Sequence, residues 1–197
     1  MKESVIENQL ETELIKQGYI VKRNARVGRW EADFVIETPE KSRTLVELKN
    51  RQIGIPDVLS VASMANNMSG PFQVTSGSIV TTDVPTRTVL QAALDNNVEV
   101  WIVKEPQELV KKAMLATMAR QLYMRLRKLS NEKITDKSVD LASVTDGLCA
   151  RNVIDESVCR ELEWVQVTRD KVTNGSLLDE AELDEANNKA TKLLKKF

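Results

Sequence analysis

The sequence predicts an α/β fold in its first half and an all-helical module in its second. Two observations support this division of the 197 residues. Short apolar runs with strand character alternate with helical patterns up to Val103, as in sheets with crossover helices. After Glu105-Pro106 no convincing strand occurs. We therefore expect an α/β domain over 1–105 and a helical module over 106–197, with a mixed central sheet flanked by helices in the first.

The first elements are predicted from spacing and turn residues. Apolar residues at helical spacing over 4–17 indicate a helix, and Gly18 is a natural C-terminal stop. We expect a polar loop over 24–31. Around it we place three strands, at 19–23, 32–37 and 43–49. The segment TPEKS between the last two is typical of a hairpin connection.

The later elements continue the alternation. Pro56 lies in the first turn of a predicted helix that Gly70-Pro71 ends. A strand, a helix and a further strand are predicted at 76–83, 86–97 and 98–103. Four helices are expected after the boundary, near 107–130, 136–151, 155–173 and 179–196.

The composition limits the chemistry. The sequence contains no histidine. Zinc sites with imidazole ligands, Ser-His-Asp hydrolysis and histidine-based nuclease mechanisms are therefore excluded. The net charge of −1 means that any nucleic-acid surface must gather its basic residues on one face. Any hydrolytic reaction must use carboxylates, lysine and a hard metal ion.

Composition also predicts the compartment. No apolar run reaches the length of a membrane span, and the acidic, polar start MKESVIENQLETE is unlike a secretory signal. Cys149 and Cys159 match no metal or redox spacing, and we expect them to be small buried side chains with free thiols. These features predict a cytoplasmic protein with no membrane association.

Three residues stand out as candidates for catalysis. Side chains alternate along a strand, so Glu47 and Lys49 of RTLVELK project from one face. Asp33 lies on the other strand of the expected hairpin. Mg²⁺ binds one or two carboxylates together with water and substrate phosphate, and a lysine nearby can orient the attacking water. An exposed charge pair on a sheet is the alternative interpretation, but these charges lie at the ends of apolar runs beside a polar loop.

The order of these motifs resembles a known superfamily. A helix, a Gly-Tyr-Ile-Val strand, Ala-Asp-Phe-Val-Ile, a hairpin and Leu-Val-Glu-Leu-Lys follow one another. This order is similar to that of the restriction-endonuclease-like PD-(D/E)xK superfamily, particularly its Mrr-type branch. The closing strand, alanine-rich helix and strand are also similar, so the resemblance covers about residues 4–103.

The resemblance implies a role for each matched position. Asp33 and Glu47 would bind Mg²⁺, for which Mn²⁺ could substitute, and the carbonyl of Leu48 would join them. Lys49 would position water. Glu7 would be an auxiliary acid, with Glu11 as the alternative one turn further on. Many Mrr-type members carry a glutamine on the helix after the lysine strand, and the segment VLSVASMANNMS has none.

Basic and polar residues near these motifs are candidates for DNA contacts. Such side chains bind phosphates in protein–DNA complexes. The candidates are Arg23, Arg26, Arg29, Arg51 and Gln52.

The helical module carries less specific signals. The helix over 107–130 has a basic flank that either follows a nucleic-acid backbone or is simply solvated. The segment near 148–175 faintly resembles helical bundles of the HEPN and DUF4145 types. Those bundles place a histidine where this chain has Asn174, so a ribonuclease site is not expected there. We expect a role in dimerisation or targeting.

The function predicted first is a Mg²⁺-dependent endonuclease that hydrolyses DNA phosphodiester bonds in restriction, phage defence or repair. The partner would be DNA, and the protein would be a homodimer or a subunit of a larger nuclease or defence complex. The first alternative is a non-catalytic nucleic-acid-binding or assembly subunit that retains the nuclease fold. The second is an interaction protein whose helical module is the active part.

Overall fold

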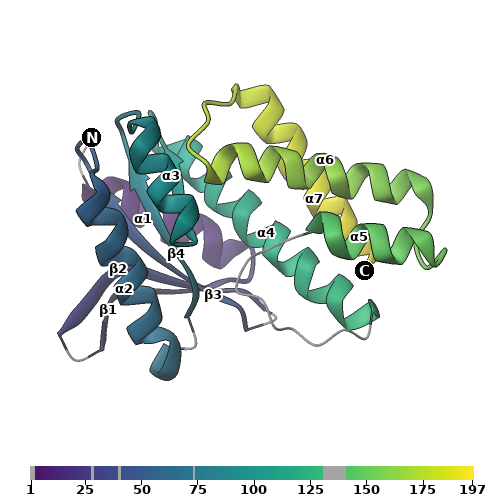
Figure 1. Cartoon of the computed structure of the whole chain (residues 1–197), viewed down its shortest axis with the longest axis horizontal. Coiled ribbons are helices and arrows are strands. Elements are labelled where there is room, and N and C mark those ends of the chain that lie inside the picture. Colours follow the sequence, from purple (N-terminus) through teal and green to yellow (C-terminus); the bar gives the residue numbers. More distant parts are fainter. Residues whose placement is uncertain (1–2, 28, 40, 73, 131–140) are drawn as a thin grey trace.

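The structure is a computed structural model that describes residues 3–27, 29–39, 41–72, 74–130 and 141–197. The first part alternates helices and strands, and the second is helical (Figure 1). The elements of the first part are α1 (Glu3–Lys16), β1 (Ile20–Val27), β2 (Trp30–Glu37), β3 (Arg43–Lys49), α2 (Ile55–Phe72), β4 (Val74–Thr81), α3 (Arg87–Asp95) and β5 (Val98–Ile102). Those of the second are α4 (Pro106–Ser130), α5 (Leu141–Ala150), α6 (Glu156–Thr173) and α7 (Glu180–Lys196).

The five strands form one mixed sheet in the order β1-β2-β3-β4-β5. The first three are antiparallel neighbours, whereas β3, β4 and β5 run parallel to one another. Hairpins join the antiparallel strands, and α2 and α3 provide the crossovers that parallel strands require. The expected fold class, an α/β core with a mixed sheet followed by helices, is confirmed.

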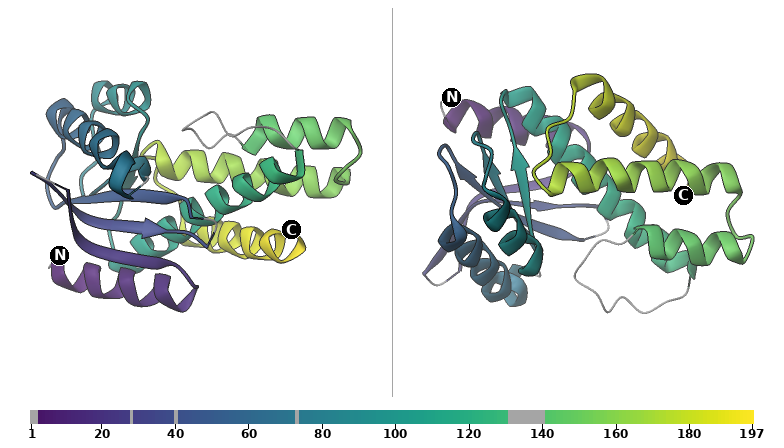
Figure 2. Two further views of the ribbon diagram at one scale, coloured as in Figure 1. Left: turned by 90° about the horizontal axis from the view of Figure 1, so that it is seen from below. Right: turned by 45° about the horizontal axis from the view of Figure 1, so that its top comes forward.

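The two faces of the sheet are covered by different helices. Figure 2 (left) shows α1 on one side of the sheet and α2 and α3 on the other. Phe34 and Val46 pack with Leu10 of α1 in the larger hydrophobic cluster. Val35 and Leu45 belong to the cluster on the α2 side. This division decides which helix each strand side chain can meet.

The larger cluster continues into the helical region. It includes Trp101 of β5, Leu115 of α4, Leu162 of α6 and Leu193 of α7. The last strand, β5, ends at Ile102, and the described residues from Pro106 onward form helices, while the apolar packing runs across this change. None of the helices in the described ranges is long and apolar enough to cross a membrane.

The close contact between α2 and β4 depends on a glycine. A Cβ atom added at Gly77 of β4 would lie 2.7 Å from Cγ1 of Val61 on α2. That separation is far below an ordinary carbon–carbon contact. Only glycine at this position allows the helix to pack at its observed distance from the sheet.

The strands around the first hairpin differ from the expectation. The structure extends β1 to Val27 and begins β2 at Trp30, where a loop over 24–31 was expected. Polar side chains over this stretch hid the strands, because β1 is an edge strand whose outer side chains face water. A cross-strand ion pair between Arg26 and Glu31, which lie opposite each other, supports the extension.

One helix differs from its expected end, and the start of another cannot be compared with the prediction. The α2 helix passes Gly70-Pro71, where an end was predicted, and ends at Phe72. The helix predicted over 136–151 is described over Leu141–Ala150, and positions 136–140 of that prediction lie outside the described residues.

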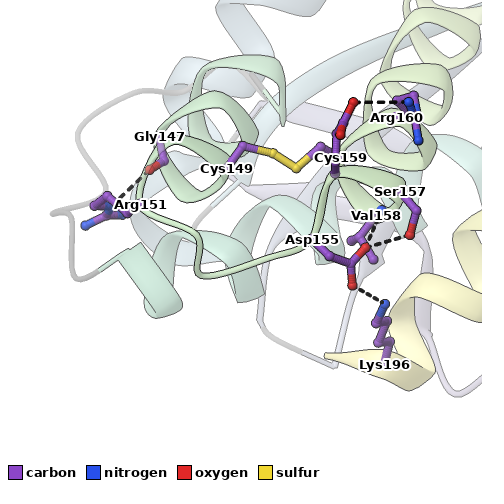
Figure 3. Close-up of a disulfide and its surroundings, with 10 residues drawn as sticks. Gly147, Cys149, Arg151, Asp155, Ser157, Val158, Cys159, Arg160 and Lys196 are labelled. Atoms are coloured by element: carbon purple, nitrogen blue, oxygen red, sulfur yellow. Dashed lines mark hydrogen bonds and ion pairs between the residues drawn. A yellow bond between two sulfur atoms is a disulfide. The ribbon is translucent and has the colours of Figure 1, made fainter.

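The expectation of two free thiols is wrong. Cys149 at the end of α5 and Cys159 in the first turns of α6 form a disulfide, with their Cα atoms 6.5 Å apart (Figure 3). The short connection between the helices turns back at Asn152, whose φ is 55°, and Asp155 caps α6. This turn places the two helix ends side by side. Spacing along the sequence does not reveal such a helical hairpin.

Candidate active site

Asp33 and Glu47 come together on neighbouring strands. The antiparallel register pairs Phe34 with Val46, which places Asp33 beside Glu47 on the face opposite the Phe34 side chain. The backbone N–H of Asp33 donates to Glu47 Oε1 at 3.3 Å, and the N–H of Leu48 donates to Asp33 Oδ2 at 2.7 Å. The strand alternation predicted from the sequence thus brings the two carboxylates to one place.

A local irregularity in β1 lies beside this pair. The β1–β2 register runs from Arg23–Phe34 to Ala25–Ala32, with no pair between Asn24 and Asp33. Asn24 has a φ of 46°, in the left-handed region that asparagine tolerates better than most residues. The interruption lies opposite Asp33, whose N–H turns to the Glu47 carboxylate.

Lys49 completes the predicted trio. Its Nζ lies 2.8 Å from Glu47 Oε2, on the same face of β3. Glu47 is 6% exposed, and the Lys49 side chain is 29% exposed. Lys49 therefore binds the buried Glu47 carboxylate while part of its own side chain is exposed to solvent.

Burial dominates the electrostatics of Glu47. It raises the pKa of this carboxyl, the Asp33 charge raises it further, and the hydrogen bond from Lys49 acts in the opposite direction. Burial tends to lower the pKa of Lys49, but the Glu47 hydrogen bond and the charges of Glu47, Asp33 and Asp57 outweigh it, so this pKa is raised. The site thus concentrates negative charge around a protonated lysine.

This donor set fits a small divalent cation. Two adjacent carboxylates, one of them buried, offer the oxygen ligands that Mg²⁺ takes alongside water and phosphate. Burial and, to a lesser extent, the Asp33 charge raise the pKa of Glu47, and a bound cation would offset both effects. Within the described part of the chain, no group of three or more acidic or cysteine side chains could hold an ion. A metal here would depend on this pair, on a backbone carbonyl such as that of Leu48, and on water.

The structure does not bring Glu7 to this pair. The α1 helix covers the Phe34 face of the sheet, opposite the face that carries Asp33 and Glu47. Glu7 Oε2 lies 3.7 Å from Arg23 Nη1, and Glu11 Oε2 lies 2.8 Å from Arg23 Nη2. Both candidates for the auxiliary acid are thus engaged with one arginine on that face.

The residues expected to contact DNA are dispersed. Arg23 is half-buried between α1 and the sheet, whereas Arg26 is exposed and pairs with Glu31. Arg29 is exposed and lies over the Trp30 ring, 4.9 Å from its centroid. Arg51 and Gln52 lie two and three residues after Lys49 and are exposed.

Asp57 is a neighbour of the site that the sequence analysis missed. It lies in the first turn of α2 and accepts two hydrogen bonds from Arg51, from Nη1 at 2.9 Å and from Nη2 at 2.6 Å. The Arg51 hydrogen bond is the main cause that lowers the pKa of Asp57. The available signal was Pro56-Asp57 at the start of the helix after the lysine strand.

The basic flank of α4 does not form a nucleic-acid surface at two of its positions. Lys112 is fully buried, donates to the carbonyl of Ile102 and lies 2.7 Å from Glu108 Oε1. Arg120 is 4% exposed and pairs with Glu99 of β5. These cations stabilise the junction between the helices and the sheet.

No protein-family model matches the sequence, and no curated protein matches it significantly. Two solved structures are similar in fold. One is a repair endonuclease from Pyrococcus abyssi, with a TM-score of 0.44 and 15% identity over 53% of this chain and 47% of that one. The other is a complex of EndoMS with double-stranded DNA, with a TM-score of 0.42 and 16% identity over 51% of this chain and 44% of that one. The chain thus aligns with less than half the length of either protein.

The fold and the site together define an α/β protein with a carboxylate pair and a lysine on one face of a mixed sheet. The particular arrangement is Asp33 on β2 with Glu47 and Lys49 on β3.

Proposed function

We propose that this protein is a Mg²⁺-dependent endonuclease that hydrolyses DNA phosphodiester bonds in restriction, phage defence or repair. The observation that carries the proposal is the convergence of Asp33, Glu47 and Lys49, with Lys49 Nζ 2.8 Å from Glu47 Oε2. The absence of histidine from the sequence excludes histidine-based hydrolysis, whereas the carboxylates and the lysine of this site can support a metal-dependent one. The two similar endonuclease structures are too distant to support the activity.

Each residue has a defined task in this proposal. Asp33 and Glu47, with the Leu48 carbonyl, would hold the ion, and the Leu48 N–H keeps the Asp33 carboxylate in place. When bound, Mg²⁺ would supply Lewis-acid polarisation of the phosphate and a lower pKa for water. Lys49, held by Glu47, would orient the attacking water and offset negative charge on the phosphate.

The proposal is tested by nicking of supercoiled plasmid DNA with Mg²⁺ or Mn²⁺. Asp33→Asn, Glu47→Gln and Lys49→Ala are each expected to lower the rate at least about a hundredfold. Glu7→Gln is expected to retain nicking, because Glu7 lies by Arg23 on the opposite face. Asp184→Asn is the matched control, since Asp184 pairs with Lys111 in the helical region. Unchanged nicking in all three site variants would contradict the proposed site.

A second measurement separates metal binding from turnover. Calorimetric titration with Mn²⁺ should show one site that Asp33→Asn and Glu47→Gln abolish and Lys49→Ala retains. DNA binding without any nicking, in a wild-type protein that also fails to bind Mn²⁺, would favour the non-catalytic alternative. The proposed homodimer is tested by light scattering.

A further inference from the structure

Arg51 and Asp57 form a two-point contact beside the carboxylate pair. Arg51 Nη1 donates to Asp57 Oδ2 at 2.9 Å, and Nη2 donates to Oδ1 at 2.6 Å. The same Nη1 also donates to the carbonyl of Gln52 at 3.0 Å. Such bidentate pairs fix the orientation of a guanidinium more firmly than a single hydrogen bond does.

This contact leaves one edge of the guanidinium open. Arginine has five N–H donors, and three of those of Arg51 are used in the contacts with Asp57 and Gln52. Within the described part of the chain, the Nε–H and the second Nη2–H have no protein acceptor. These two donors lie on the same edge, and the Arg51 side chain is 59% exposed. A guanidinium edge of this kind binds a phosphate with two parallel hydrogen bonds.

The backbone around Arg51 is held at the same end of the sheet as Lys49. Thr81 at the end of β4 is the register partner of Lys49, and its Oγ1 donates to the carbonyl of Arg51 at 2.9 Å. Asp57 Oδ2 also accepts from the N–H of Gly54 at 2.9 Å. The loop between β3 and α2 is therefore held by Thr81 of β4 and by Asp57 of α2. Arg51 follows Lys49 by two residues and shares its surroundings.

Asp57 binds the Arg51 guanidinium and is itself largely shielded from solvent. Its side chain is 16% exposed, whereas that of Arg51 is 59% exposed. The half-buried Asp57 carboxylate binds one edge of the Arg51 guanidinium and so restricts the rotamers of Arg51. The edge that carries Nε–H and the second Nη2–H stays uncovered. Immobilising a side chain as long as arginine on binding has an entropic cost, and a fixed orientation removes part of that cost.

We propose that Asp57 is a positioning residue that presents the open edge of Arg51 to a phosphate of the DNA strand lying at the Asp33–Glu47–Lys49 site. This inference rests on the proposed function for the identity of the ligand. Arg51 makes the contact, and Asp57 acts only through Arg51. In the opposite arrangement, Asp57 would neutralise Arg51 and weaken binding of the phosphate. If Asp57 positions Arg51, removing the Asp57 charge weakens DNA binding. If Asp57 only neutralises Arg51, removing that charge strengthens DNA binding.

The test is binding of a short DNA duplex without divalent metal, measured by fluorescence anisotropy over a range of salt concentrations. Arg51→Ala is expected to weaken binding roughly tenfold, as loss of a charge-assisted contact does. It should also reduce the slope of log K against log salt by about 0.9, the value for one phosphate contact. Asp57→Asn is expected to weaken binding about fivefold, although it removes a negative charge.

The double variant separates positioning from a loss of structure. Because Asp57 acts through Arg51, adding Asp57→Asn to Arg51→Ala should cause no further loss of affinity. Damage to the fold would add a loss in either background and would appear as a lower midpoint of thermal unfolding. Asp184→Asn, which breaks an ion pair with Lys111, should leave affinity unchanged.

The outcomes distinguish this inference from the proposed function. Unchanged or tighter binding in Asp57→Asn would overturn the positioning role while metal-dependent nicking by the wild type still stood. A wild type that binds DNA but does not nick it, with the expected losses in Asp57→Asn and Arg51→Ala, would support the role of Asp57 and contradict the nuclease. A wild type that does not bind DNA would overturn the inference.

Discussion

Replacing Glu99 by glutamine is expected to destabilise the protein more than any exposed charge substitution. Glu99 on β5 is 8% exposed and lies among the helices that cover one face of the sheet. Arg120 of α4 and Arg169 of α6 both contact its Oε1, and their side chains are 5% and 10% exposed. Ser78 Oγ and Trp101 Nε1 donate to Oε2 at 3.3 Å and 3.2 Å.

The expected loss follows from the burial of the two guanidiniums. Removing one partner of a buried ion pair costs about 3–5 kcal/mol, because the remaining charge has no compensation. Arg169 retains Asp170, 3.0 Å from its Nη1, so we expect the lower end, about 3 kcal/mol. A domain of this size should then lose about 6–12 °C in its unfolding midpoint.

Urea unfolding followed by far-ultraviolet circular dichroism measures this loss. Glu156→Gln is the matched control, because Glu156 pairs with Arg160 at 3.1 Å on the surface, with side chains 84% and 68% exposed. The free energy of unfolding of Glu156→Gln should fall by less than about 1 kcal/mol. A loss below about 1 kcal/mol for Glu99→Gln would refute the reasoning, since the two guanidiniums would then be compensated without Glu99.

Three other substitutions have expected outcomes. Gly77→Ala should lower the free energy of unfolding by about 1–3 kcal/mol, because it forces α2 away from β4, whereas Gly147→Ala has open space and should not. The hydrogen bonds from the Ser157 hydroxyl and the Val158 N–H lower the pKa of Asp155 from 3.8 to about 2 in the folded protein, so its stabilising contribution is present above pH 3.8 and is lost as the pH falls toward 2. Acid titration of stability should therefore be flatter for Asp155→Asn than for the wild type over that window, and identical curves would contradict the capping role. Replacing Cys149 and Cys159 by serine should cost about 3 kcal/mol under oxidising conditions and much less once the wild type is reduced, as urea unfolding with and without a thiol reductant would show.

The central part of the candidate site was predictable from local sequence. Side chains on a strand alternate with a period of two, so Glu47 and Lys49 had to share a face once the strand was identified. A short hairpin then places Asp33 on the adjacent strand. The bounds of β3, Arg43–Lys49, agree with the prediction because its apolar run is buried on both faces and contrasts clearly with the flanking polar residues.

Predictions that depended on distant parts of the chain were less secure. The acids of α1 are at suitable positions along the sequence, but the side of the sheet on which α1 packs places Glu7 by Arg23. The extension of β1 was hidden because an edge strand carries polar side chains. The cysteine pair was missed because a helical hairpin brings residues ten positions apart together.

The sequence by itself determined the α/β class, the exclusion of histidine chemistry and the pairing of Glu47 with Lys49, because composition and strand periodicity are local properties. Only the tertiary structure decided that Glu99 of β5 compensates two buried arginines of α4 and α6, and that Glu7 of α1 lies by Arg23 of β1. The physical reason is that these contacts join residues on different elements. Their proximity depends on how helices pack against the two faces of the sheet, which no spacing along the chain specifies.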